Sequence, residues 1–86
     1  MAIRANMPSI TVITPRVLRA ARVLAGLRQL DLSKKSKSAL RSLRDYEGGK
    51  SSPRLETMQK WIAALEKCNV TVVENGDGVS IKLRKR

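Results

Sequence analysis

Apolar and polar residues follow two different periods along this chain, and each period predicts a different kind of element. In four segments between residues 15 and 69, apolar residues recur three and four positions apart, which is typical of one face of an α-helix. Residues 70–74 and 79–83 instead alternate apolar and polar positions, as half-buried strands do. The Asn-Gly-Asp-Gly sequence between them favours a hairpin turn, because Asn and Gly tolerate positive φ. The pattern predicts a mainly α protein with a small β element, a C-terminal β-hairpin and basic tail over residues 70–86.

Before the first helix, the sequence predicts a flexible N-terminus and a short strand. Residues 1–8 should be a flexible N-terminus, and residues 9–14 are rich in β-branched side chains, which indicates a short strand. Thr14 and Pro15 then form a strong helix start, a threonine cap followed by proline at the first helical position. We expect this helix to end near residue 26, with an apolar side made of Val17, Leu18, Ala21, Leu24 and Ala25.

Start and stop signals bound the other three helices. The second should cover residues 29–36, and the third should begin at Ser38 or Ala39 and end at a pair of glycines. The fourth should run over about residues 53–69. Its core-facing residues are expected to be Leu55, Met58, Trp61, Ile62 and Leu65.

Charge then points to the kind of partner. The 86 residues are enough for one small domain, and 18 Lys and Arg against 7 Asp and Glu give a net charge of +11. Such a balance favours a polyanion, nucleic acid first and an anionic membrane surface second. Residues 1–27 contain no acid, and Arg16, Arg19 and Arg22 recur every three residues. This basic stripe has two interpretations, a solvated face or a face that contacts phosphate.

The composition also argues against several classes of protein. One cysteine and no histidine remove the usual disulfide, zinc and histidine-based catalytic sites, and Cys68 is interpreted as a packed thiol. No segment resembles a signal peptide or a membrane span, so a cytoplasmic protein is expected. Tyr46 and Trp61 fall on apolar stripes, which disfavours an RNA-stacking surface. No catalytic constellation is present, so we expect no enzyme activity, no cofactor, no metal and no small-molecule ligand.

Residues 29–49 are the most informative part of the chain. They predict two short amphipathic helices joined by a tight polar turn, a shape that enters the DNA major groove. On the second helix Arg41 and Arg44 share a face, while Leu43 and Tyr46 turn toward the core. Arginine is the commonest bidentate partner of guanine O6 and N7. The expected partner is therefore double-stranded DNA.

Two other residues of this segment are candidates for DNA contact. Gln29, at the start of its helix, can bind a phosphate through its side-chain amide or its backbone N–H. Leu40 has two open roles, contact with a thymine methyl group or packing against the preceding helix.

From Leu24 to about Leu65 the chain resembles the phage-repressor-like (XRE-type) helix-turn-helix family. The matching residues are Gly26, Gln29, Leu32, the run Leu43-Arg44-Asp45-Tyr46-Glu47, Gly49, Pro53, Thr57, Met58 and Leu65. The resemblance implies a lambda-repressor-like four-helix domain over residues 15–69. It implies phosphate contacts near Gln29 and Lys50, base-edge contacts from Leu40, Arg41 and Arg44, and positions near the DNA backbone for Lys37 and Ser38.

The chain departs from the family pattern at the turn between the second and third helices. Lys37 stands where the family usually has glycine, so either it adopts a left-handed conformation at a cost of about 1 kcal/mol or the turn takes another geometry. Ala39 replaces the serine that normally caps the third helix, so Ser38 is expected to supply the cap. Ser33 and Ser36 stand where small alanines usually pack.

These features predict a sequence-specific transcriptional regulator of bacterial or phage origin, a repressor that binds a palindromic operator as a homodimer. Two other functions stay open, an antitoxin-like protein-interaction module with DNA-binding activity and a non-specific basic nucleoid-associated protein. The N-terminal strand and the hairpin are expected to pair, either within one chain or between two copies. The candidate dimerisation residues are Ile10, Val12, Ile13, Val72, Val79 and Ile81.

Overall fold

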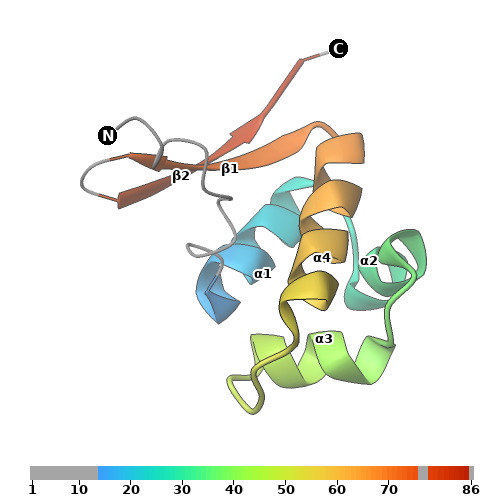
Figure 1. The fold of residues 1–86 in the computed structure, drawn as a ribbon. Coiled ribbons are helices and arrows are strands. Elements are labelled where there is room, and N and C mark those ends of the chain that lie inside the picture. The colour runs from blue at the N-terminus through green and yellow to red at the C-terminus, as the bar shows by residue number, and fades with distance from the viewer. Residues whose placement is uncertain (1–13, 76–77, 86) are drawn as a thin grey trace.

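The computed structural model describes residues 14–75 and 78–85, which form four helices and an antiparallel hairpin (Figure 1). The elements are α1 (Pro15–Leu24), α2 (Gln29–Ser36), α3 (Leu40–Glu47), α4 (Leu55–Lys67), β1 (Val70–Asn75) and β2 (Gly78–Leu83). The predicted fold class, mainly α with a C-terminal hairpin, is confirmed. The expected flexible segment 1–8 and strand 9–14 lie outside the described residues, except for Thr14.

α1 begins where its sequence predicts. The Thr14 hydroxyl accepts a hydrogen bond from the Val17 N–H at 3.2 Å, and Pro15 occupies the first helical position. The helix ends at Leu24, about two residues earlier than expected, and Gly26 then takes a left-handed conformation with φ 77°. Leu24 was expected on the apolar side, but it is 41% exposed because this last residue lies at the edge of the buried stripe.

The core is built around Trp61 of α4. Its side chain is fully buried and stacks on Tyr46 of α3, with 5.6 Å between the ring centroids. The indole N–H donates a hydrogen bond to the Ser38 hydroxyl at 2.9 Å, so the polar atom of the ring is satisfied. Both aromatic rings are therefore unavailable for base stacking, as predicted. The other large, fully buried side chains are Leu18, Leu32, Leu43, Leu65 and Val70.

One residue expected in the core of α4 is exposed. Leu55 has an exposed fraction of 59%, whereas Trp61 and Leu65 are buried. Leu55 is the first residue of the helix, and at about 100° per residue it lies roughly a quarter turn away from the side occupied by Trp61 and Leu65. The apolar spacing thus predicted the helix, but α4 begins at Leu55, about two residues later than expected.

The hairpin packs against α1 and α4 at the end of the molecule away from α3 (Figure 1). Val70 pairs with Leu83 and Val72 with Ile81, so these four side chains share one face of the sheet. Val70 and Val72 are buried and Ile81 packs against the same core. The hairpin thereby closes the core on the side opposite α3.

The turn between α2 and α3 uses Lys37 in a left-handed conformation, with φ 57° and ψ 42°. This was one of the two geometries expected from the missing glycine. Ser33 and Ser36 are buried, as their small size allows. The expected cap of α3 is wrong, because α3 begins at Leu40 and no side chain caps it. The Ser38 hydroxyl is instead held by Trp61 and lies 2.7 Å from the Ser36 hydroxyl.

Candidate nucleic-acid interface

α3 has one side in the core and one side in solvent. Leu43 and Tyr46 are buried, whereas Arg41 and Arg44 are exposed on the opposite side of the helix. Leu40 is half-buried at the edge between them. The division of α3 expected from the sequence is therefore present, with two guanidinium groups directed away from the core.

Asp45 is a third residue of this outward side, and it was not predicted as a site residue. The Arg41 Nε lies 3.8 Å from an Asp45 carboxylate oxygen, and the exposed fractions of the two side chains are 91% and 39%. The four-residue spacing of an arginine and an acid on a helix was the signal that could have found it. A carboxylate on this side can accept a hydrogen bond from cytosine N4, which extends the chemistry of the surface beyond guanine.

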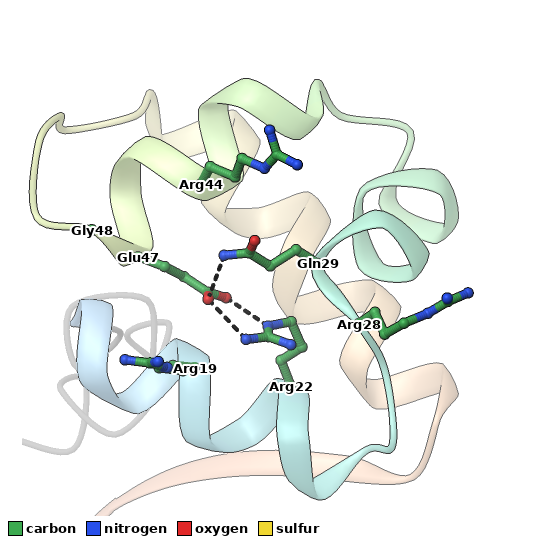
Figure 2. A pocket seen from close by; sticks show the side chains of 7 residues that line it. All are labelled: Arg19, Arg22, Arg28, Gln29, Arg44, Glu47 and Gly48. Carbon is green, nitrogen blue, oxygen red and sulfur yellow. Dashed lines mark hydrogen bonds and ion pairs between the residues drawn. The ribbon is translucent and has the colours of Figure 1, made fainter.

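A buried ion pair ties α1, α2 and α3 together behind this surface (Figure 2). The Glu47 carboxylate accepts hydrogen bonds from Arg22 Nε at 2.8 Å and Arg22 Nη2 at 3.0 Å. It accepts a third from Gln29 Nε2 at 3.0 Å. Arg22 also donates to the Leu27 carbonyl at 2.9 Å, and the exposed fractions of the Arg22 and Glu47 side chains are 12% and 4%. Arg22, Gln29 and Glu47 are called the Glu47 clamp below.

The Glu47 clamp changes what was expected of Arg22 and of Gln29. Arg22 was grouped with Arg16 and Arg19 in a basic stripe, but its guanidinium is directed inward and is neutralised by Glu47. Gln29 was expected to bind phosphate through its side chain or its backbone. Its amide nitrogen donates one hydrogen bond to Glu47, so the second amide hydrogen and the backbone N–H in the first turn of α2 are the groups left for an anion.

Two surface hollows lie on opposite sides of α3 and share no residue. The first, here called the arginine hollow, lies between α1, α2 and α3 and is drawn in Figure 2. The second lies between α3, the following loop and the start of α4. Residues that line the first include Arg19, Arg22, Arg28, Gln29, Arg44 and Glu47, and those that line the second include Arg41, Ser42, Ser51, Ser52, Arg54 and Thr57.

The start of α2 is fixed by a local ion pair. The Arg28 backbone N–H donates to Asp31 Oδ2 at 2.9 Å, and the Arg28 guanidinium donates to both carboxylate oxygens at 3.0 and 3.2 Å. These side-chain and backbone hydrogen bonds lower the pKa of Asp31 from 3.8 to about 2. The carboxylate stays ionised and satisfies donors at a helix end that has no other side-chain cap.

The remaining predicted contact residues are not all equally accessible. Lys37 and Lys50 are exposed, on the two loops that flank α3. Ser38 is half-buried and its hydroxyl bonds inside the protein, so any DNA contact from this position falls to its backbone. Lys34 and Lys35 are exposed on α2, as expected of a solvated face.

The candidate dimerisation residues also differ in how accessible they are. Val72 is buried and Ile81 half-buried within one chain, whereas Val79 is 39% exposed. Ile10, Val12 and Ile13 lie outside the described residues. The part of the chain that the structure describes contains no helix long and apolar enough to cross a bilayer, and no cluster of three metal-ligating side chains.

Comparison with known proteins identifies a family over most of the described domain. A family model described as helix-turn-helix matches residues 18–73, from within α1 to within β1. The match includes the Glu47 clamp, the left-handed turn at Lys37 and the outward arginines of α3. No curated protein sequence matches the chain.

Proposed function

Because the chain belongs to the helix-turn-helix family of DNA-binding regulators, we propose that it is a sequence-specific transcription factor that represses by occupying a palindromic operator as a dimer. α3 would lie in the major groove, and Arg41 and Arg44 would contact guanine edges. The observation that carries this proposal is the two-sided α3, with buried Leu43 and Tyr46 behind two exposed guanidinium groups.

The surroundings of α3 support the same docking. A helix in the major groove has a phosphate strand on each side of it, and α3 has a hollow on each side. The arginine hollow offers guanidinium groups. The other hollow offers the hydroxyls of Ser51, Ser52 and Thr57, with exposed Lys50 close by in sequence. Hydroxyl and guanidinium groups are common phosphate ligands, so both strands would be held without reading their sequence.

The hairpin supports a dimer. Val79 and Leu83 lie on the same face of the sheet as the buried Val72, yet they are 39% and 51% exposed. The core face of the hairpin therefore continues past the helices of its own chain. A second copy could cover it, together with the β-branched segment that contains Ile10, Val12 and Ile13.

Selection of bound duplexes from a random pool at about 0.15 M salt, the physiological ionic strength, tests the proposal. We expect an enriched inverted repeat with half-site centres about 34–36 Å apart. The enriched duplex should bind roughly 10³-fold or more tightly than a scrambled copy. No enrichment, with both duplexes bound alike, would leave a non-specific basic protein and refute the proposal.

Substitutions in α3 then assign the contacts. Arg41→Ala and Arg44→Ala should each relax preference at one base position by about 1–3 kcal/mol, or roughly 5- to 150-fold. Lys34→Ala removes the same charge from exposed α2 surface and should leave base preference unchanged. If Lys34→Ala weakens preference as much as the α3 changes do, α3 is not the element that contacts the bases.

A further inference from the structure

We propose that Arg16 and Arg19 of α1 form a phosphate-binding track that joins the arginine hollow and holds the DNA backbone beside the sequence read by α3. This inference rests on the proposed function, because it needs DNA docked on α3. It assigns a role to a part of α1 that lies apart from the helix-turn-helix itself.

The two arginines belong to a continuous depression. Arg19, Glu47 and Gly48 line the arginine hollow and also an adjoining hollow that extends over the start of α1 to Arg16. In Figure 2 the side chains of Arg19 and Arg44 lie on opposite sides of Glu47. The depression therefore leads from the outward side of α3, across the end of that helix, to the first turn of α1.

The charges along this depression are unbalanced. Its carboxylate, Glu47, is 4% exposed and neutralised by Arg22. Among the residues that the structure describes, the ion pairs use Arg22, Arg28 and Arg41, and none uses Arg16, Arg19 or Arg44. Three exposed guanidinium groups along one depression repel each other in the free protein, so the arrangement is stabilised when an anion binds.

The shape suits a sugar–phosphate backbone. Gly48 and Gly49 line the adjoining hollow where α3 ends, and a Cβ added at Gly49 would meet no atom within 4 Å. Among the described residues that line the adjoining hollow, Arg16 and Arg19 supply positively charged donors and Thr14 a hydroxyl, which are common phosphate ligands. Arg16 and Arg19 are three residues apart on one helix, with Cβ atoms about 5–6 Å from each other, so both can reach one strand. A linear polyanion fits this track better than a compact ligand does.

The test compares two double variants with the same loss of charge. Arg16→Gln with Arg19→Gln removes the track, and Lys34→Gln with Lys35→Gln removes two exposed cations of α2. Affinity for the selected operator is measured over a range of salt concentrations, and phosphate contacts are mapped by ethylation interference. All four substituted residues are exposed, so both variants should unfold at the wild-type urea midpoint.

The track predicts a specific combination of results. The slope of log K against log salt should become shallower by about 1.8 in the α1 variant, because each lost phosphate contact removes about 0.9. Interference should disappear at phosphates outside the bases read by α3, while the ratio of operator to scrambled affinity stays the same. The α2 variant should match the wild type in all three measurements.

Other results overturn the inference. An unchanged slope and interference pattern in the α1 variant would show that Arg16 and Arg19 belong to a solvated face and do not contact phosphate. The proposed function would be unaffected. A reduced operator-to-scramble ratio would mean that they act on base reading. If poly-glutamate competes as strongly as DNA and the α1 variant loses both equally, the surface takes any polyanion. A wild type that prefers no sequence would instead refute the proposed function.

Discussion

The Glu47 clamp makes a prediction about stability that the structure allows to be worked out. Glu47→Gln keeps the size of the side chain but replaces one accepting oxygen by an amide that donates. One N–H of Arg22, whose side chain is 12% exposed, would then face another donor. The guanidinium would lose its counter-charge while it stays buried, and this is the damaging way to break an ion pair.

The size of the effect depends on the hydrogen bonds that Arg22 retains in the variant. Removal of one partner of a buried pair costs about 3–5 kcal/mol. Arg22 retains its hydrogen bond to the Leu27 carbonyl, and one oxygen remains at position 47, so we expect the lower end, about 3 kcal/mol. For a domain of this size, that corresponds to a fall of about 12–24 °C in Tm.

Urea unfolding followed by tryptophan fluorescence measures this change directly. Trp61 is the only tryptophan of the chain and is fully buried beside Tyr46, so its emission reports on the packing of the core. Glu66→Gln makes the same chemical change on the exposed surface of α4 and should not move the midpoint measurably.

A double variant separates the loss of the pair from the loss of packing. Arg22→Met with Glu47→Met removes both charges, so most of the stability lost in Glu47→Gln should return. The reasoning is refuted if Glu47→Gln shifts the midpoint no more than Glu66→Gln does, or if the double variant is less stable than the single one.

Three smaller predictions concern the start and end of α2 and the core hydrogen bond. Lys37→Gly should stabilise the fold by about 1 kcal/mol, because glycine adopts φ 57° without steric strain; the urea midpoint measures it. Arg28 lowers the pKa of Asp31 to about 2, so the stabilising pair is complete above about pH 4 and is lost as the pH falls toward 2. The difference in urea midpoint between wild type and Asp31→Asn should therefore shrink as the pH falls from about 4 to about 2. Ser38→Ala should cost about 1–3 kcal/mol, because the indole N–H of Trp61 loses its acceptor; thermal unfolding measures it.

Each of these predictions has a control variant or a result that would contradict it. Lys35→Gly, in the last turn of α2 where the backbone is helical, should destabilise by about 0.5–1 kcal/mol, and a stabilising effect there would remove the conformational explanation for Lys37. For Asp31, a midpoint difference that does not change with pH would exclude the ion pair as its source. Ser42→Ala removes a half-buried hydroxyl of α3 outside this network, and a loss equal to that of Ser38→Ala would show that the Trp61 bond is not the cause.

The features that the sequence predicted well depend on residues that lie close together along the chain. The start of α1 follows from Thr14 and Pro15, which act within one turn of each other. A left-handed conformation of Lys37 was one of two geometries expected, because the family that the chain resembles usually has glycine at this turn position. The hairpin follows from the alternation of Val79, Ile81 and Leu83 with polar residues and from the Asn-Gly-Asp-Gly turn sequence before them.

The errors concern partners that are distant in sequence. Arg22 has the same three-residue spacing as Arg16 and Arg19, and nothing local shows that it pairs with Glu47, 25 residues away. Ser38 was assigned a capping role from its place before α3, but Trp61, 23 residues later, takes its hydroxyl. Periodicity indicates which side of a helix is buried, and the partner that each polar group finds there depends on the packing of the whole domain.

The separation between the outward side of α3 and the Glu47 clamp has a consequence for how such a regulator can evolve. Arg41 and Arg44 are exposed and Asp45 is partly exposed, so substitutions at these positions can change the preferred operator while the domain stays folded. Glu47 lies on the same helix but faces inward, so its loss would weaken binding to every operator at once. Among duplicated copies of this protein, the outward positions should diverge and residue 47 should not.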